Sequence, residues 1–224
     1  MLEGISWLGH DSFLLVELGT GKRVLIDPYK LAKPVAADLI LITHPHFDHY
    51  SPDDVRQCAG PTTHFVTVAD VASSLQGRVT VIKPGDKVVV EGVPIETVPA
   101  YNTNKFRAPG QPFHPKSKGW VGFIVTLNGQ RFYHTGDSDF VDEMRDLNVD
   151  IALLPVSGTY VMTPEEAAEA AKALRPRVAV PMHYGAIAGS EAEARRFAAL
   201  CKQAGIETEI LRPGIEPSNP KATS

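Results

Sequence analysis

Short apolar runs separated by glycine-containing turns make up the first part of the chain. Residues 2–8, 13–18 and 23–27 are apolar or alternate between apolar and polar positions, and Gly9-His10-Asp11 and Gly19-Thr20-Gly21 separate them. Such alternation is typical of strands, and short turns of this composition join antiparallel neighbours. The pattern therefore predicts a β-meander at the start of the chain.

Strands and helices alternate through the rest of the chain. A hydroxyl residue precedes acidic residues at Ser51-Pro52-Asp53-Asp54, Thr163-Pro164-Glu165-Glu166 and Ser190-Glu191-Ala192-Glu193, which predicts helix starts. Asn128-Gly129 between two apolar runs predicts a hairpin. The other predicted elements are strands over residues 39–43, 63–68, 78–82, 87–91, 93–99, 120–127, 130–134, 151–155, 177–182 and 206–211, and short helices over 70–75 and near 141–147. The strands between residues 63 and 99 are expected to form an antiparallel ladder.

The order of these elements indicates an α/β (α+β) fold in two comparable halves joined near Gly92. Two sheets packed face to face, with helices on both outer faces, would bury the apolar runs. No composition shift marks a boundary, so residues 1–212 are predicted to form a single domain. Residues 213–224 are polar and contain prolines, and we expect a loosely ordered tail.

The segment Thr43-His44-Pro45-His46-Phe47-Asp48-His49 directly follows a predicted buried strand. Neutral imidazole nitrogens and carboxylate oxygens are ligands that Zn²⁺, Mn²⁺ and Fe²⁺ accept. In a tight loop, His44 and His46 can point to one side while Asp48 and His49 reach a second point nearby. The segment therefore has the donors for two neighbouring metal ions.

This HxHxDH motif after a hydrophobic strand resembles the signature of the metallo-β-lactamase superfamily. The resemblance implies an αββα four-layer sandwich with two pseudo-symmetric halves and a metal site at one edge between the sheets. It also implies further ligands at later strand ends. Asp137, in His134-Thr135-Gly136-Asp137, matches the aspartate that bridges two ions, and His183 matches the last histidine ligand. Asp27 resembles the buried aspartate that orients the histidine loop.

One ligand of the superfamily pattern has no match at the expected position. Many members have a histidine where this chain has Tyr101-Asn102-Thr103-Asn104. The nearest downstream histidine is His114, in a proline-rich segment that could hold it fixed. We therefore predict His114 as the remaining ligand; the alternative is a loop histidine that faces solvent or the substrate.

Further residues are predicted to line the site or support its ligands. His10 lies in a glycine–histidine turn that resembles the superfamily branch containing sugar-phosphate lactonases, and His134 is expected to hydrogen-bond near Asp137. Tyr101, Tyr160 and Tyr184 lie in segments expected at the same edge.

Residues 101–119 have neither helix nor strand periodicity, and they contain several basic side chains. A loop this long inside a domain is usually functional or mobile. Lys105, Arg107 and Lys116 are predicted to bind or steer an anionic substrate such as a carboxylate or a phosphate. The alternative is a solvated basic loop.

The composition of the chain limits the kinds of partner that the protein is expected to bind. A formal net charge of −4 argues against nucleic acid as the main partner, because phosphate binding needs a basic surface. No apolar run approaches the roughly 18 residues that span a membrane, and the first residues lack the features of a signal peptide. Cys58 and Cys201 stand alone and are expected to be reduced thiols inside helices. We expect a cytoplasmic protein; a homo-oligomer is compatible with the sequence.

These observations favour a metal-dependent hydrolase. Two divalent ions, zinc first and manganese or iron as alternatives, would supply hydroxide near pH 7 from a shared water. The predicted substrate is a small ester, lactone or phosphodiester, and Asp48 is the predicted catalytic residue for proton transfer. Two alternatives are a nuclease or phosphodiesterase that acts on nucleic acid, and a metal-binding or scaffold protein with little turnover. Thioester hydrolysis and di-iron redox chemistry also stay open.

Overall fold

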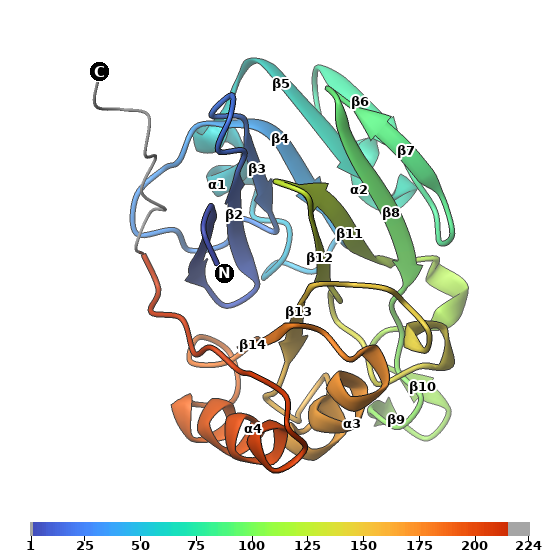
Figure 1. The fold of residues 1–224 in the computed structure, drawn as a ribbon. Helices are drawn as coiled ribbons and strands as arrows, with labels where there is room; N and C mark the ends of the chain where they lie inside the picture. Colours follow the sequence, from blue (N-terminus) through green and yellow to red (C-terminus); the bar gives the residue numbers. More distant parts are fainter. Residues whose placement is uncertain (1, 215–224) are drawn as a thin grey trace.

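The computed structural model describes residues 2–214 and contains two six-stranded sheets (Figure 1). The first sheet has its strands in sequence order, antiparallel from β1 to β3 and parallel from β3 to β6. Its strands are β1 (Ile5–Gly9), β2 (Ser12–Val16), β3 (Arg23–Ile26), β4 (Ala37–Ile42), β5 (Ala59–Thr67) and β6 (Arg78–Val81). The predicted β-meander is therefore confirmed.

The second sheet repeats this plan. Its order is β14-β13-β12-β11-β8-β7, antiparallel from β7 to β12 and parallel from β12 to β14. Its strands are β7 (Lys87–Val90), β8 (Val93–Pro99), β11 (Val121–Leu127), β12 (Gln130–His134), β13 (Ile151–Pro155) and β14 (Val178–Met182). Each sheet thus runs from antiparallel to parallel pairing, which gives the two halves their pseudo-symmetry.

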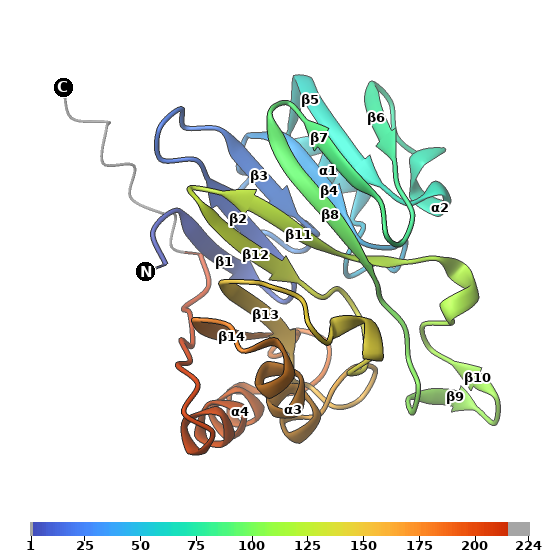
Figure 2. The ribbon, with the colours of Figure 1, turned by 45° about the vertical axis from the view of Figure 1, so that its right-hand side comes forward.

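Helices complete the sandwich. The longer ones are α1 (Pro52–Cys58), α3 (Pro164–Leu174) and α4 (Glu191–Gln203), with the short α2 (Ala69–Ala72) and the 3₁₀ turns η1 (Lys116–Lys118) and η2 (Asp142–Met144). Capping boxes at Thr163 and Ser190 begin α3 and α4, as the sequence predicts. These two helices pack on each other and against β13 and β14, and α1 and α2 lie beside the first sheet (Figures 1 and 2).

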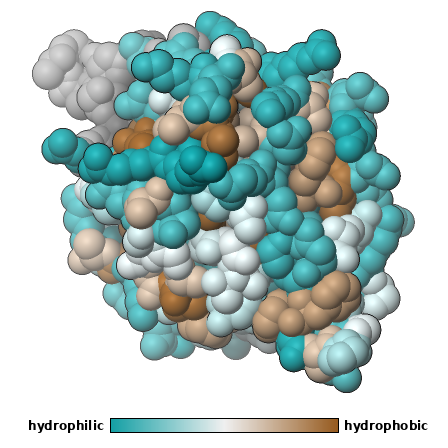
Figure 3. Space-filling view, turned by 90° about the horizontal axis from the view of Figure 1, so that it is seen from below, coloured by the Kyte–Doolittle hydropathy of each residue, from teal (hydrophilic) through white to brown (hydrophobic). Residues whose placement is uncertain are grey.

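A single apolar core fills the space between the sheets. Leu15 and Leu41 of the first sheet and Phe123 and Leu153 of the second are inaccessible to solvent and belong to one cluster of buried side chains. Burial of such side chains is the main favourable term in folding. The four-layer αββα prediction is confirmed. On the face that carries α3 and α4, hydrophobic residues form separate patches on a largely hydrophilic surface (Figure 3).

The predicted junction between the halves was wrong. The chain crosses from the first sheet to the second between β6 and β7, and Gly92 lies inside the β7–β8 hairpin of the second sheet. The expected antiparallel ladder was also wrong for β5 and β6, which are parallel. The connection through α2 carries the chain back along the sheet, so that β6 runs in the same direction as β5. A two-residue turn would have made the two strands antiparallel.

Two further segments, 101–119 and 206–211, differ from their predicted secondary structure. The segment 101–119 contains a small hairpin of β9 (Phe106–Ala108) and β10 (Gln111–Pro112), which projects from the sandwich in Figure 2. The expected strand 206–211 makes only an isolated bridge between Thr208 and Ala179.

Cys58 and Cys201 are free buried thiols in α1 and α4, as predicted. Of the predicted tail, residues 215–224 lie outside the described residues. Within residues 2–214, none of the helices combines the length and the apolar character needed to cross a membrane.

Candidate metal centre

The carboxyl ends of several strands meet at one edge of the sandwich. His10 follows β1, His44 follows β4, Asp137 follows β12 and His183 follows β14. Ligands in mixed sheets commonly bind at this end of the strands. Residues that are distant in sequence therefore come together as two adjacent clusters of potential metal ligands.

The first cluster contains His44, His46, His114 and Asp137, whose donor atoms all lie within 4.8 Å of one another. Nε2 of His114 is 3.1 Å from Nδ1 of His46 and 3.1 Å from Oδ2 of Asp137. The structure thus places His114, from the long loop, at the position that the HxHxDH segment leaves open.

Neighbouring side chains fix which nitrogen of each histidine is free. Nδ1 of His114 donates to Oδ1 of Asn102 at 2.8 Å, since an amide oxygen can only accept. The Thr43 hydroxyl donates to Asp27 and accepts from Nδ1 of His44 at 2.9 Å. Both histidines therefore present the lone pair of Nε2 to the cluster, the arrangement usual for metal-binding histidines.

The second cluster shares Asp137 with the first and adds His49 and His183. Oδ1 of Asp137 is 3.1 Å from Nε2 of His49 and 3.3 Å from Nε2 of His183. Nδ1 of His49 donates to Oδ2 of Asp27 at 2.7 Å, and Nδ1 of His183 lies 2.9 Å from the hydroxyl of Ser157. The Nε2 atoms again point inward.

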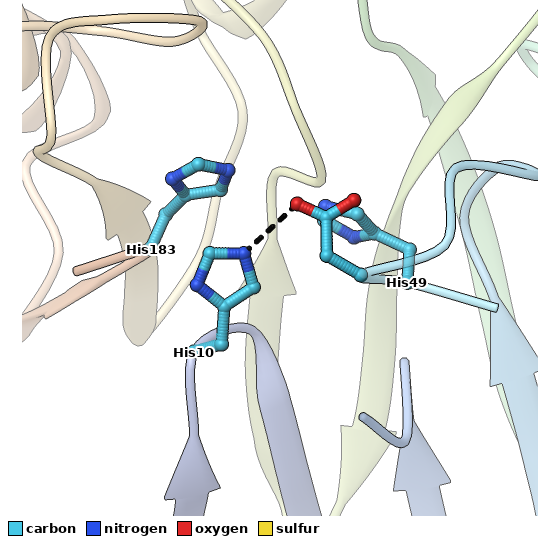
Figure 4. A group of neighbouring side chains, drawn as sticks. His10, His49 and His183 are labelled. Atoms are coloured by element: carbon cyan, nitrogen blue, oxygen red, sulfur yellow. Dashed lines mark hydrogen bonds and ion pairs between the residues drawn. The ribbon is translucent and has the colours of Figure 1, made fainter. Parts of the chain in front are cut away.

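Asp48 and His10 border the second cluster. Nε2 of His10 is 3.1 Å from Oδ2 of Asp48. Figure 4 shows His10 beside His49 and His183. A group of His10, Asp48, His49 and His183 also has donor atoms within 4.8 Å of one another. Burial alone would raise the pKa of Asp48, but the hydrogen bond from His10 lowers it below its usual value.

Asp137 lies between the two clusters because of the backbone before it. Gly136 adopts a positive φ of 61°, and a Cβ at this position would lie 2.9 Å from the carbonyl oxygen of Val121. Only glycine fits there without strain. The two oxygens of Asp137 then face different clusters, Oδ1 toward His49 and His183 and Oδ2 toward His114.

Three polar residues of the site adopt left-handed backbone conformations. His10, Asp27 and His183 have φ values of 49°, 45° and 58°. Non-glycine residues rarely adopt this region, and those that do cluster at functional sites. Here the conformation turns the backbone sharply at a strand end, so that His10 and His183 face the second cluster and Asp27 reaches Thr43 and Nδ1 of His49.

The donor set fits divalent cations. Several atoms are buried and have no hydrogen-bond partner among the described residues: Nε2 of His44, His49 and His183, Oδ1 of Asp137 and both oxygens of Asp11. Buried polar atoms without partners are costly and call for an explanation such as an ion. Imidazole nitrogens and carboxylate oxygens that converge on two points provide that explanation.

Comparison with known proteins places the chain in a family. Residues 4–183 match the beta-lactamase superfamily domain. The chain belongs to the beta-lactamase superfamily. It is 33% identical to a UPF0173 metal-dependent hydrolase from Methanopyrus kandleri, over 94% of this chain and 97% of that protein. A UPF0173 metal-dependent hydrolase from Thermoplasma acidophilum is 34% identical over 95% and 96%. A crystal structure from Parabacteroides distasonis, assigned as a metal-dependent hydrolase, superposes with a TM-score of 0.80 at 32% identity, covering 94% of this chain and 93% of that one.

The two clusters differ in the pKa values of their histidines. Burial, and then the neighbouring imidazoles, lower the pKa of His44 well below its usual value and that of His46 to about 4. Burial would also lower the pKa of His183, but the carboxylates of Asp137 and Asp11 outweigh it and raise that pKa to about 9. His49 likewise has a pKa well above its usual value, since Asp137 and Asp27 outweigh burial.

A pocket of about 420 Å³ opens onto the clusters. His46, Asp48, His114 and Asp137 face it from the metal-binding edge. Its other lining residues are Phe47, Phe113, Tyr160, Ile187 and Arg107. Tyr160 packs edge-on against Phe113, with ring centroids 4.9 Å apart, and the exposed Arg107 lies over the Phe113 ring at 5.6 Å. The pocket therefore combines aromatic walls with one cation near its opening.

Some residues predicted to line the site are directed elsewhere. Lys116 forms an ion pair with Glu143 at 2.7 Å, and the Tyr101 hydroxyl donates to the same glutamate. Lys105 forms an ion pair with Glu166 at 2.7 Å. The Tyr184 ring packs at a tilt against Trp7, with ring centroids 4.8 Å apart, and borders a second cavity. Tyr101, Lys105, Lys116 and Tyr184 are not among the residues that line the pocket over the clusters, and their roles as supporting or substrate-binding residues stay predictions.

The predicted supporting role of His134 has a specific geometry. Its Nε2 donates to the carbonyl oxygen of Asp11 at 2.9 Å, and its Nδ1 accepts from the backbone nitrogen of Gly136 at 3.1 Å. His134 thus joins the β1–β2 turn to the residue before Asp137, and it belongs to neither cluster.

Two residues of the site were not identified from the sequence. Asn102 occupies the segment in which the superfamily pattern has a histidine, and it holds His114 instead. Asp11 lies in the second cluster, with Oδ2 3.3 Å from Nε2 of His49. Its position next to His10 in the first turn was the only available signal.

Proposed function

We propose that this protein is a hydrolase that holds two divalent ions, one in each cluster, with Asp137 as their common ligand. The observation that carries the proposal is the orientation of the Asp137 carboxylate, whose two oxygens face different groups of histidines. The first ion would be held by His44, His46, His114 and Asp137, and the second by His49, His183, Asp137 and Asp48. Zinc is the first choice, with manganese and iron as alternatives.

Bound divalent ions supply a nucleophile from water at neutral pH and polarise the oxygen of the group to be cleaved. Asp48 borders the pocket and is held as a carboxylate by its hydrogen bond from His10. It is therefore placed to accept a proton from water and to return it to the leaving group. His10 positions that carboxylate.

The pocket supports a small substrate with an apolar part and an anionic group. The aromatic side chains of Phe47, Phe113 and Tyr160 provide apolar walls, and Arg107 offers a planar cation for a carboxylate or a phosphate. Esters, lactones and phosphodiesters of this kind fit the chemistry of the centre.

The ion pairs of the lysines in residues 101–119 favour a small-molecule hydrolase over a nuclease. Lys105 and Lys116 are paired with Glu166 and Glu143, and Lys118 lies 3.8 Å from Asp70. Neutralised lysines contribute little to binding a polyphosphate backbone. A short anionic substrate needs only Arg107.

Metal content and activity test the proposal together. Chelator-treated protein is reloaded with Zn²⁺ or Mn²⁺, its metal is quantified by elemental analysis, and hydrolysis of p-nitrophenyl acetate and bis(p-nitrophenyl) phosphate is followed. We expect two equivalents of metal per chain and metal-dependent hydrolysis. Asp137→Asn should lose both, whereas Asp150→Asn, at the opposite end of β13, should match the parent protein. Two tightly bound ions without hydrolysis of any ester or phosphodiester would instead favour a metal-binding protein.

A further inference from the structure

Asp11 is a buried carboxylate to which neither the predicted ligand set nor the proposed function gives a role. It follows His10 in the turn between β1 and β2, and it is inaccessible to solvent. Neither of its side-chain oxygens has a hydrogen-bond partner among residues 2–214. A carboxylate buried in this way is unfavourable unless a cation compensates it.

The surroundings of Asp11 show where that cation would lie. Oδ2 of Asp11 is 3.3 Å from Nε2 of His49 and 3.8 Å from Nε2 of His183. Asp11, His49, Asp137 and His183 have donor atoms within 4.8 Å of one another. The carboxylate therefore faces the same point as the ligand nitrogens of the second cluster.

Orientation of the histidines is not an adequate role for Asp11. His49 is already held through Nδ1 by Asp27 at 2.7 Å, and Nδ1 of His183 is 2.9 Å from Ser157. Each ring is thus positioned from its outer side, while Asp11 approaches the inner nitrogen that would bind an ion.

The turn that carries Asp11 is fixed from three sides. Trp7 Nε1 donates to the carbonyl oxygen of His10 at 2.8 Å, and His134 Nε2 donates to that of Asp11 at 2.9 Å. The Ser12 hydroxyl donates to the carbonyl oxygen of Asp27 at 2.6 Å. A ligand on a fixed backbone is held in place before the ion binds, as a built site requires.

We propose that Asp11 is a direct ligand of the ion in the second cluster, an inference that rests on the proposed dinuclear function. The two sites then differ in chemistry. The first has three imidazoles and one carboxylate, whereas the second has His49 and His183 with the carboxylates of Asp11, Asp137 and Asp48. Imidazole-rich sites suit zinc, and carboxylates favour harder ions such as Mn²⁺. The second site is therefore the one that accepts manganese, with zinc in the first.

Manganese titration of the zinc-loaded protein tests this assignment. Chelator-treated protein receives one equivalent of Zn²⁺, and Mn²⁺ is then added while the six-line signal of free Mn²⁺ is followed by electron paramagnetic resonance. The parent protein should bind one equivalent of Mn²⁺. Asp11→Asn should bind it at least roughly tenfold more weakly, with the affinity for the first Zn²⁺ unchanged. Asp150→Asn is the matched control and should behave as the parent.

A second measurement separates ligation from a structural role. Asp11 Oδ2 lies 3.3 Å from Nε2 of His49 and 3.8 Å from Nε2 of His183, so loss of Asp11 can lower the Tm of the metal-free protein without any role in binding metal. The second measurement is therefore the affinity for the first Zn²⁺, which Asp11→Asn should leave as in the parent. Unchanged Mn²⁺ affinity in Asp11→Asn, or an equal loss of affinity for the first Zn²⁺, would overturn the assignment while leaving the dinuclear proposal intact. A parent protein that binds no second ion would overturn both.

Discussion

Nε2 of His114 lies 3.1 Å from Oδ2 of Asp137, although His114 comes from an irregular loop and Asp137 from the end of a central strand. This contact completes the first cluster. It also joins the loop after β8 to the carboxylate that both clusters share, so the loop is part of the candidate site.

Replacement of His114 tests this role. His114→Ala should lose the ion of the first cluster, since three donors would remain of the four that face it. Its zinc affinity should fall by more than the roughly 10- to 100-fold that loss of a ligand's hydrogen-bond partner costs. Isothermal titration with Zn²⁺ measures this change. His64→Ala is the control because His64 bonds to Thr80 and lies in neither cluster. Equal zinc affinity in both variants would remove His114 from the site.

Asn102 should matter almost as much as the ligand that it holds. Its side-chain oxygen accepts from both the backbone nitrogen and Nδ1 of His114, each at 2.8 Å. Asn102→Ala should therefore weaken zinc binding roughly 10- to 100-fold and lower the free energy of unfolding by about 1–3 kcal/mol. Titration calorimetry and urea denaturation measure the two effects. Asn104→Ala, whose side chain contacts the exposed edge of Glu166, should change neither beyond experimental error. If Asn102→Ala keeps its zinc affinity, the proposed support of His114 is refuted.

Arg107 should affect the binding of substrate more than its turnover. Arg107→Ala removes the cation at the pocket, so KM for an anionic ester should rise about tenfold, corresponding to one charged hydrogen bond. The kcat should change little, because Arg107 is not among the residues of either metal cluster. Steady-state kinetics with anionic and neutral esters of similar size provide the measurement. Lys116→Ala, which removes a lysine paired with Glu143, should leave KM unaltered. The same KM for Arg107→Ala and the parent would exclude this contact.

The two clusters should take up metal with different pH dependence. In the metal-free protein the pKa of His183 is raised to about 9, so its proton must be displaced at neutral pH. Affinity for the second ion should therefore increase by at least about tenfold per pH unit below pH 9. The pKa of His46 is lowered to about 4 and that of His44 lies well below its usual value, so these two ligands should add no such dependence above about pH 5.5, and uptake of the first ion should depend less steeply on pH. Titration calorimetry in buffers of different ionisation enthalpy measures the released protons. Equal pH dependence of both equivalents would contradict the assignment.

The fold and much of the candidate site were predictable because strand periodicity is a local property. Apolar runs located β4, β12 and β14, and the resemblance to the metallo-β-lactamase superfamily implied that the residues after them, His44, Asp137 and His183, share one site. The junction between the sheets was less predictable, since strand direction depends on how the chain returns across the sheet.

Long-range pairing explains what the sequence could not reveal. Lys105 was predicted to contact an anionic substrate, but it pairs with Glu166, which is 61 residues away in the sequence. Asp11 resembled an ordinary turn aspartate, and its complete burial depends on the packing of both sheets. Asn102 is similar, because an amide reveals no role until the ring that it holds is placed beside it.

Anomalous X-ray diffraction from crystals of the metal-loaded protein tests the central claim most directly. Data collected at the zinc and manganese edges locate each ion and identify its element. We predict two peaks on opposite sides of the Asp137 carboxylate, one enclosed by His44, His46 and His114 and the other by His49, His183 and Asp11. A single peak, or a second peak away from Asp137, would contradict a dinuclear centre.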